Sequence, residues 1–332
     1  MRAFVVREID EQLSCDVEEV TPTPSGDNDV LVGIDFSSVN FKDAMVASVK
    51  SRVRRVNSLV AGVDAAGVIE QSNDPALSVG TRVAVHGGNI GVGRDGGFAA
   101  FVYAPARYLS PLPSTISTRD AMVIGTAGFT AMASVLALED RGLAPGAQVL
   151  VTGASGGVGS QSLTYLARRG YEPVASTGTL SEAQWLIDRG ASRVIGRSEV
   201  SDRPERVLGS ELWDGAIDCV GGDTLHQILR TLRHGACVAA CGLVGSADLT
   251  TTLYPFITRG VALIGIDAVE ATPATRHRVW QALGDIAPEV DFSNFVDRVI
   301  ALEGLVEALD DVRQGSTRGR ILVQIESPSS PI

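Results

Sequence analysis

VLVTGASGGVGS, residues 149–160, joins an apolar run to closely spaced glycines and then to a stretch with helical periodicity. Gly153, Gly156 and Gly159 have the spacing G-x-x-G-x-x-G, and Gly157 adds a further glycine. Glycine lets the backbone approach a pyrophosphate, whose charge is attracted by the N–H groups at the start of the following helix. This strand-turn-helix predicts a dinucleotide-binding turn, and a purely structural glycine turn is the alternative.

Apolar runs and amphipathic stretches alternate on the C-terminal side of residue 148. Strands are predicted at residues 149–151, 173–176, 193–195, 215–220, 236–241 and 261–266, with helices such as 158–169 and 181–189 between them. Buried strands that alternate with helices are typical of an α/β doubly wound parallel sheet. Capping patterns predict two further helices, one from Ser117 to about residue 138 and one from Thr272-Pro273 to residue 283.

The N-terminal part has strand signals separated by turns and predicts an antiparallel, barrel-like domain. These strands are predicted at residues 3–6, 30–39, 59–69, 82–86 and 97–103. The tail, residues 318–325, is strand-like and is expected to return to this domain. A chain of 332 residues is long enough for two cores, since single cores rarely exceed about 250 residues.

Composition narrows the classes of partner. The net charge of -11 argues against general binding to nucleic acid or to an anionic membrane. The start of the chain lacks the apolar run of a signal peptide, and we expect no stretch of about 20 apolar residues that could span a membrane. The four cysteines follow no disulfide framework, so a cytoplasmic location is expected.

The end of the second strand of the doubly wound region bears on cofactor choice. An NAD site would have an acid about 20 residues after the glycines, at the end of this strand, but the first acid beyond the strand is Glu182. The hydroxyls of Ser176, Thr177 and Thr179 could instead accept a 2′-phosphate, or they could belong to an ordinary polar loop. These residues favour NADPH over NADH, although the loop contains no arginine.

With this turn placed, the chain resembles the quinone oxidoreductase-like branch of the medium-chain dehydrogenase/reductases, and within it the acrylyl-CoA reductase family. The resemblance extends from MRAFVV to GRILVQI and rests on SSVNFKDAM (37–45), AGVDAAGVI (61–69), IGTAGFTAM (124–132), VTGASGGVGS, DGAIDCVGG (214–222), AACGLVGSADL (239–249) and PFITRGVALIGIDAV (255–269).

The resemblance implies a GroES-like β-barrel catalytic domain, residues 1–120 completed by about 290–328, and a Rossmann domain, residues 121–289. It also implies a cleft at the domain junction, a small-molecule substrate and a homodimer. Zinc independence is expected because the G-H-E of zinc alcohol dehydrogenases is replaced by Gly62-Val63-Asp64, and because the closely spaced cysteine lobe is missing.

The resemblance also implies site residues. Cofactor binding is expected at Phe41, Thr126, Ser155, Gly156, Gly157, Val158, Thr177, Gly178, Thr179, Gly242, Leu243, Ile266 and Asp267. Asn40 and Lys42 are the candidate catalytic residues beside the reacting carbons. Two departures from the family pattern matter: Phe41 replaces a common tyrosine, and Thr177-Gly178-Thr179 replaces a common S-G-R, which removes a cation for the 2′-phosphate.

Several of these residues also have ordinary structural interpretations. Asn40 could simply form a turn, Lys42 and Asp43 could form a local ion pair, and Thr126 could bond to its own helical turn. The basic loop Lys50-Ser51-Arg52-Val53-Arg54-Arg55 could be a solvated face. Alternatively, Arg52, Arg54 and Arg55 could hold the phosphates of a CoA thioester.

The predicted reaction is hydride transfer from NADPH to an activated carbon–carbon double bond, with a short enoyl-CoA such as acrylyl-CoA as substrate and propionyl-CoA as product. The proton donor stays open between a ribose hydroxyl, water and the region of Asn40 and Lys42. A quinone or alkenal oxidoreductase is the alternative within the enzyme class. A non-catalytic NADPH-binding protein is the alternative outside it.

Overall fold

The computed structural model describes residues 1–24, 26, 29–200 and 207–326, and it divides into two compact units. Unit 1 comprises Met1–Thr126 and Ala268–Ile332, and unit 2 comprises Ala127–Asp267. The segment 268–289, assigned above to the Rossmann domain, therefore lies in unit 1. It packs there because Arg276 lies against His86, and because the Thr115 hydroxyl donates to the carbonyl of Gly284 at 3.0 Å.

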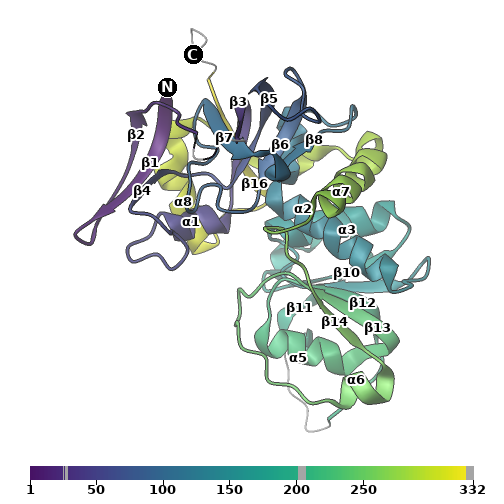
Figure 1. The fold of residues 1–332 in the computed structure, drawn as a ribbon. Helices are drawn as coiled ribbons and strands as arrows, with labels where there is room; N and C mark the ends of the chain where they lie inside the picture. Colours follow the sequence, from purple (N-terminus) through teal and green to yellow (C-terminus); the bar gives the residue numbers. More distant parts are fainter. Residues whose placement is uncertain (25, 27–28, 201–206, 327–332) are drawn as a thin grey trace. The chain divides into compact units, whose positions relative to one another are not determined.

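Unit 2 is built on a parallel sheet of six strands in the order β11-β10-β9-β12-β13-β14 (Figure 1). Its strands are β9 (Gln148–Val151), β10 (Glu172–Thr177), β11 (Arg193–Gly196), β12 (Trp213–Asp218), β13 (Leu232–Ala240) and β14 (Ala262–Gly265). Its helices are α3 (Gly157–Arg168), α4 (Ala183–Ile187), α5 (Gly222–Thr231), α6 (Tyr254–Arg259) and most of α2 (Thr118–Asp140), with short 3-10 turns at Leu180–Glu182 and Arg197–Val200. The prediction of an α/β doubly wound parallel sheet is confirmed.

Unit 1 contains a sheet of seven strands that includes the C-terminal strand, and a smaller sheet with the order β2-β1-β4. Its strands are β1 (Arg2–Ile9), β2 (Gln12–Glu19), β3 (Asp29–Val39), β4 (Ser58–Val60), β5 (Asp64–Gln71), β6 (Arg82–His86), β7 (Phe101–Pro105), β8 (Leu109–Pro111), β15 (Val296–Ile300) and β16 (Arg320–Gln324). Its helices are α1 (Phe41–Val46), α7 (Pro273–Ile286) and α8 (Leu305–Gln314), with 3-10 turns at Ala106–Tyr108, Ala287–Glu289, Phe292–Phe295 and Leu302–Gly304.

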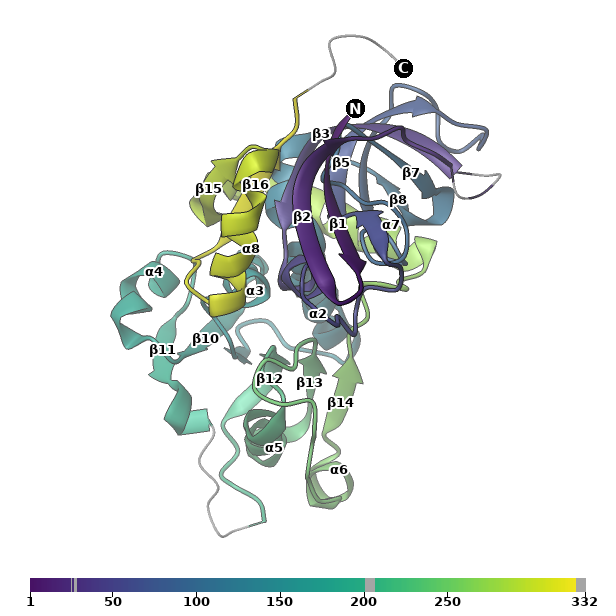
Figure 2. The ribbon, with the colours of Figure 1, turned by 90° about the vertical axis from the view of Figure 1, so that its left-hand side faces the viewer.

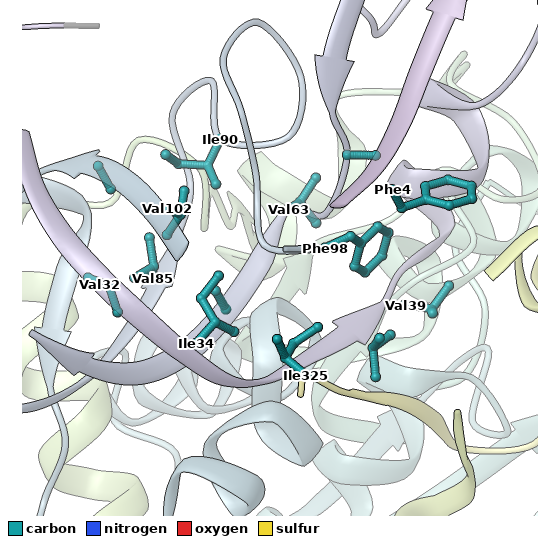
Figure 3. Close-up of a cluster of buried hydrophobic side chains, with 14 of the residues drawn as sticks. Phe4, Val32, Ile34, Val39, Val63, Val85, Ile90, Phe98, Val102 and Ile325 are labelled. Atoms are coloured by element: carbon teal, nitrogen blue, oxygen red, sulfur yellow. The ribbon is translucent and has the colours of Figure 1, made fainter. Parts of the chain in front are cut away.

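The returning tail is part of the core of unit 1. β16 pairs antiparallel with β3, with Leu322 opposite Ser38, so the predicted return of residues 318–325 is confirmed. Figure 3 shows Ile325 among side chains of the N-terminal segment such as Ile34. In the same core, the rings of Phe4 and Phe98 meet edge to face with centroids 6.2 Å apart. Apolar burial on this scale is the main stabilising contribution to the unit.

Two sequence expectations for unit 1 are corrected. The structure adds β2, which forms a hairpin with β1 (Figure 2, purple). The single strand predicted at 59–69 is two strands, β4 and β5, because the backbone turns at Gly62, whose φ is 104°. A positive φ of this size favours glycine, since a Cβ would clash with the backbone.

The helix α2 has the length and hydropathy of a membrane span, and 83% of its apolar window is buried within the protein. The expectation that no stretch approaches such a span is therefore wrong for α2. Its burial is that of a core helix in a soluble protein, where an all-round apolar sequence faces other protein elements. Dihedral angles break the helix at Gly125, where φ is 52°.

Candidate functional site: a nucleotide turn in unit 2 and a buried polar network in unit 1

The glycine turn of unit 2 has the geometry that the sequence predicts. β9 ends at Val151 and α3 begins at Gly157, with Gly156 in an extended conformation as the N-cap and no side chain capping the helix. The Ala154 N–H donates to the carbonyl of Ser176 at 3.2 Å, which ties the turn to β10. The N-terminal N–H groups of α3 are thus available for an anion, as in known dinucleotide sites.

Close packing explains the glycine at 159. A Cβ built there would lie 2.3 Å from the carbonyl oxygen of Gly153 and 2.7 Å from the Cα of Ala154. Such distances are far inside van der Waals contact, so only glycine lets α3 start this close to the turn. Ser155, Gly157 and Val158 are half-buried and Gly156 is exposed, which leaves the backbone of the turn accessible.

The loop after β10 differs in part from the sequence expectation. Ser176 and Thr177 are each only 3% exposed, and the Thr177 hydroxyl accepts the N–H of Thr179 at 3.0 Å. Gly178 and Thr179 are exposed. The Thr177 hydroxyl therefore shapes the loop, and Thr179 is the accessible hydroxyl of the three that were proposed for a 2′-phosphate.

An arginine that sequence reasoning missed lies at this loop. Arg197 follows β11, and β11 pairs parallel with β10 so that Gly196 lies opposite Thr177. A Cβ built at Gly178 would lie 2.5 Å from Nη2 of Arg197 and 2.8 Å from its Cζ, so the guanidinium lies against Gly178. The signal was the strand order, because the ends of neighbouring parallel strands come together.

The remaining predicted cofactor residues of unit 2 follow the ends of two neighbouring strands. Gly242 and Leu243 come after β13, and Ile266 and Asp267 come after β14. The Ile266 N–H donates to the carbonyl of Ala240 at 3.0 Å. These residues therefore belong to the carboxyl edge of the sheet, the edge that also presents the glycine turn, where ligands bind in open α/β sheets.

In unit 1, a buried carboxylate organises the candidate catalytic residues. Asp64 is fully buried at the start of β5, and its Oδ1 accepts the Thr126 hydroxyl at 2.5 Å. Its Oδ2 accepts the Thr126 N–H at 2.9 Å, the Asn40 Nδ2 at 2.8 Å and the Ser38 hydroxyl at 3.0 Å. The Arg320 guanidinium lies 3.5 Å from Oδ2 and supplies the opposite charge. A buried carboxylate needs this degree of satisfaction.

Arg320 brings the C-terminal strand into the same network. Its Nη1 donates to the Asn40 Oδ1 at 3.1 Å, and its Nη2 donates to the Ser38 hydroxyl at 2.8 Å. Gly125 makes room for this arrangement, because a Cβ there would lie 2.6 Å from both the Asp64 Oδ2 and the Arg320 Nη2. We define Ser38, Asn40, Asp64, Thr126 and Arg320 as the Asp64 network.

The network changes the interpretation of two predicted site residues. Asn40 caps α1, and its amide N–H groups donate to Asp64 and, at 3.3 Å, to the carbonyl of Ser38. Its amide therefore serves the network, and the assignment of Asn40 as a catalytic residue stays a prediction. Thr126 donates hydrogen bonds to Asp64 from its N–H and its hydroxyl. The alternative considered above was a bond from its hydroxyl to its own helical turn.

Lys42 and Asp43 do not form the local ion pair considered above. Asp43 is fully buried and accepts the backbone N–H groups of Asn40 at 2.8 Å and Val63 at 2.9 Å. Burial raises the pKa of Asp43 to about 7. Lys42 is half-buried, and the described residues give its side chain neither an ion pair nor a hydrogen bond. Its neighbour Phe41 is exposed on the first turn of α1.

A small cavity of about 40 Å³ lies within unit 1, and Asn40, Lys42 and Thr126 contribute to its wall. It is lined by Asn40, Lys42, Val63, Gly87, Gly88, Ile90, Val92, Thr126, Ala268 and Val269. Most of the lining is apolar, and Lys42 is its one charged side chain. His86 lies just before this lining, and burial beside Arg276 lowers its pKa to about 3, so its imidazole is neutral at physiological pH.

The basic loop separates into two kinds of arginine. Arg54 is nearly buried, donates to the carbonyl of Ser48 at 3.2 Å and pairs with Glu8. These bonds hold the loop in place, so Arg54 is removed from the predicted phosphate-binding set. Arg52 and Arg55 are exposed, and the described residues offer their side chains no ion pair.

Metal donors do not gather in the described part of the chain. No three His, Cys, Asp or Glu side chains there are close enough to hold a metal ion. Both carboxylate oxygens of Asp64 already accept hydrogen bonds from protein groups.

Comparisons with known proteins agree with this architecture. Residues 26–114 match the alcohol dehydrogenase GroES-like domain, and residues 157–285 match the zinc-binding dehydrogenase family. Acrylyl-CoA reductase AcuI of Ruegeria pomeroyi is 40% identical over 93% of this chain and 93% of its own length. YhfP of Bacillus subtilis, provisionally named a quinone oxidoreductase, is 39% identical over 95% of this chain and 96% of its own.

Solved structures give the same result. The yhdH oxidoreductase of Salmonella enterica, crystallised with NADP, has a TM-score of 0.93 and 38% identity over 98% of this chain and 100% of its own. YhfP crystallised with NAD also has a TM-score of 0.93 and 38% identity, over 97% of this chain and 98% of its own. These similarities cover both units at well over a third identity. The chain therefore belongs to the medium-chain dehydrogenase/reductase superfamily, in the quinone oxidoreductase-like branch that includes the acrylyl-CoA reductases.

Proposed function

We propose that this protein is an NADPH-dependent, zinc-independent reductase of activated carbon–carbon double bonds, with a short enoyl-CoA such as acrylyl-CoA as substrate and propionyl-CoA as product. The observation that carries the proposal is the apolar cavity of unit 1, with the charged Lys42 in its wall beside the Asp64 network. The similarity to a protein named for acrylyl-CoA reduction supports the substrate class.

The residues of unit 2 fit a dinucleotide. The uncapped start of α3 would hold the pyrophosphate, with Ser155, Gly156, Gly157 and Val158 as the cradle. Arg197 and Thr179 would meet the 2′-phosphate, and the absence of an acid in the loop 178–181 removes the group that would repel it. This combination supports NADPH over NADH, although one relative has been crystallised with NAD.

The chain's own residues have separate tasks in the proposed chemistry. When bound, the reduced nicotinamide supplies a hydride to the β-carbon of the unsaturated thioester. Negative charge then develops on the thioester carbonyl oxygen, where the Lys42 ammonium would stabilise it, and a proton added at the α-carbon completes the saturated thioester. The Asp64 network holds Asn40 and Thr126 in place and so positions the cavity wall. Because the pKa of His86 is lowered to about 3, its imidazole is not protonated to imidazolium at physiological pH and does not serve as the acid in this step.

The CoA moiety would be recognised by Arg52 and Arg55. Both side chains are exposed, and guanidinium groups bind phosphates by charge-assisted hydrogen bonds. Arg54 keeps its structural role through Glu8. Remote phosphate contacts of this kind lower KM for a thioester and leave small uncharged enones unaffected.

Quinone reduction is the second candidate. The mostly apolar cavity lining favours it, because a quinone needs a pocket without a phosphate site, and it is the activity after which YhfP is provisionally named. The two candidate activities share the fold, the cofactor and the charged donor Lys42. Recognition of the CoA phosphates is therefore the feature that distinguishes them.

We further propose a homodimer that acts in the cytoplasm. β14 is an edge strand of the unit 2 sheet, and exposed apolar side chains lie on and before it, among them Leu253, Tyr254, Ile257 and Leu263. Unpaired strand edges with apolar side chains are suited to pairing with a second copy. Size-exclusion chromatography with light scattering tests the state, and a monomer at micromolar concentration would contradict it.

The decisive experiment supplies NADPH with acrylyl-CoA and, separately, with a simple quinone. Formation of propionyl-CoA, identified by mass spectrometry, is expected for the wild type. The Arg52→Ala/Arg55→Ala variant should have a higher KM for the thioester and an unchanged KM for a small enone, measured at low salt where screening is weakest. Rapid quinone reduction without any propionyl-CoA would overturn the CoA assignment.

Lys42 is tested with a matched lysine. Lys42→Ala should lower kcat by roughly 10²–10³-fold, the usual effect of removing one donor at a developing oxyanion. Lys50→Ala removes an exposed lysine from the same segment and should leave kcat unchanged. Equal kcat for wild type and Lys42→Ala would remove Lys42 from the mechanism.

A further inference from the structure

Two cysteines face each other at the carboxyl edge of the unit 2 sheet. Cys219 directly follows β12, Cys241 directly follows β13, and their sulfur atoms are 3.7 Å apart. The parallel register pairs Asp218 with Ala240, so the two cysteines are the next residues of the same ladder. Neighbouring strands lie about 4.7–4.9 Å apart, within the Cα separation of about 4.4–6.8 Å that a disulfide spans.

The surrounding bonds hold both strand ends in this arrangement. The Cys241 thiol donates to the carbonyl of Asp218 at 3.4 Å, and the Cys241 N–H donates to the same oxygen at 2.9 Å. The Asp218 carboxylate accepts the Thr152 hydroxyl at 2.6 Å and the Gly221 N–H at 2.8 Å. Neither cysteine residue is fully buried.

Cys219 lies against the glycine turn, and its N–H donates to the hydroxyl of Thr152 at 3.1 Å. A Cβ built at Gly153 of this turn would lie 3.2 Å from the Cβ of Cys219. Cys219 is also packed closely by the segment after β13, since a Cβ built at Gly242 would lie 2.3 Å from its carbonyl oxygen. Drawing the sulfurs from 3.7 Å to the disulfide length of about 2.05 Å is therefore expected to shift the side chain of Cys219, which packs against this turn.

We propose that Cys219 and Cys241 form a reversible dithiol–disulfide couple, closed by a low-molecular-weight disulfide, and that closure weakens dinucleotide binding at the adjacent turn. The second half of this inference rests on the proposed function. One cysteine thiolate attacks the reagent RSSR, forming a mixed disulfide and releasing one RSH. The other cysteine then attacks the protein-bound sulfur and releases the second RSH. Two protein thiols are oxidised by two electrons, and RSSR is reduced to two RSH.

The couple should close slowly at neutral pH. The neighbouring Cys241 thiol and burial raise the pKa of Cys219 well above its usual range, so its thiolate is scarce. The dithiol is thus the resting state in a reducing compartment, and oxidation needs either a high disulfide concentration or alkaline pH.

Peptide mapping after treatment with oxidised glutathione tests the couple. The full-length protein should lose two free thiols and yield a Cys219–Cys241 crosslinked peptide, and dithiothreitol should reverse both changes. In Cys241→Ser, Cys219 should instead retain a glutathione adduct. Cys237→Ser is the matched control. Cys237 is a buried cysteine on β13, the strand that precedes Cys241, and its removal should leave the crosslink intact. Two stable glutathione adducts, or two unreacted thiols at alkaline pH, would overturn the couple.

NADPH binding, measured by nicotinamide fluorescence, tests the consequence. Oxidation should raise Kd by roughly tenfold, equivalent to about 1.4 kcal/mol, and dithiothreitol should restore it. In the Cys219→Ser/Cys241→Ser variant, Kd should be the same before and after glutathione treatment. A crosslinked protein with unchanged Kd would refute the effect on binding. A reduced protein that fails to bind NADPH would refute the proposed function, while the peptide map would still decide whether the couple exists.

Discussion

The glycine turn of unit 2 and the Asp64 network of unit 1 depend on different parts of the chain, the backbone in the turn and the side chains in the network. The turn uses backbone atoms and requires positions without side chains. A Cβ at Gly159, for example, would lie only 2.3 Å from the carbonyl oxygen of Gly153. The network uses side chains, and its requirement is that the oxygens of the buried Asp64 carboxylate have hydrogen-bond donors. A local motif can specify the first, whereas the second depends on residues as distant as Asp64 and Arg320. The two should therefore fail in different ways.

The largest effect is expected from removing the centre of the network. Asp64→Ala leaves Arg320 buried without its carboxylate, and breaking such a pair typically costs about 3–5 kcal/mol of unfolding free energy. Urea denaturation measures it. Asp248→Ala, at an exposed aspartate, should stay within about 0.5 kcal/mol of wild type. If Asp64→Ala costs no more in wild type than in an Arg320→Met background, the two residues are not coupled.

The glycine turn should fail mainly in binding. Gly159→Ala forces a methyl group against the Gly153 carbonyl, and overpacking of this kind costs about 1–3 kcal/mol. NADPH affinity should fall sharply, because the start of α3 has to move away from the turn. Gly265→Ala is the control, since a Cβ there meets nothing within 4 Å. Unchanged NADPH affinity in a folded Gly159→Ala protein would contradict the proposed cradle.

Within unit 2, the side chain of Arg197 should affect the choice between NADPH and NADH. Arg197→Ala should lower the ratio of kcat/KM for NADPH to that for NADH by about tenfold or more, because a charge-assisted hydrogen bond contributes about 1.5–3 kcal/mol. Arg193→Ala, at the first residue of β11, where the guanidinium lies over the ring of Trp213, should leave the ratio unchanged. A ratio that does not move in Arg197→Ala would leave Thr179 as the candidate for phosphate selection.

The smallest effect concerns pH. The pKa of Asp43 is raised from 3.8 to about 7, so the folded protein holds this proton more tightly than the unfolded chain does. The stabilisation from the protonated acid is complete below pH 3.8 and is lost as pH rises toward 7. Asp43→Asn should be less stable overall, because its amide N–H would face a backbone N–H. Its unfolding free energy, compared with wild type across this range, should lack that part of the slope, and parallel curves would contradict the assignment.

The sheet of unit 2 could be predicted because each strand is a local apolar run between glycine-rich turns. The β1–β2 hairpin could not, since its turn residues Asp10 and Glu11 adopt φ values of 49° and 63° without the usual Asn-Gly signal. Such a turn is stabilised by the pairing of its strands, which is a property of the folded unit.

The candidate site shows the same division. The residues of the glycine turn follow from spacing, and Lys42 follows from family resemblance. Asp64 left a signal, a carboxylate within the otherwise apolar run of residues 59–69, but its partners could not be identified from the local sequence. Arg197 and Arg320 depend on which strands are neighbours, and Arg54 depends on Glu8, 46 residues away. Contacts of this range are decided by topology.

The pairing of β16 with β3 also affects the order in which the chain can be assembled during synthesis. Residues 127–267 form a unit from one continuous segment, so the ribosome releases everything this unit needs in a single stretch. Unit 1 cannot be completed at that stage, because β3 lacks β16 along one edge and the Asp64 carboxylate lacks Arg320 until residues 320–324 emerge. Since domains fold as units during translation, the nascent N-terminal segment exposes an unpaired strand edge throughout that interval. It is in this interval that we expect the chain to depend most on chaperones.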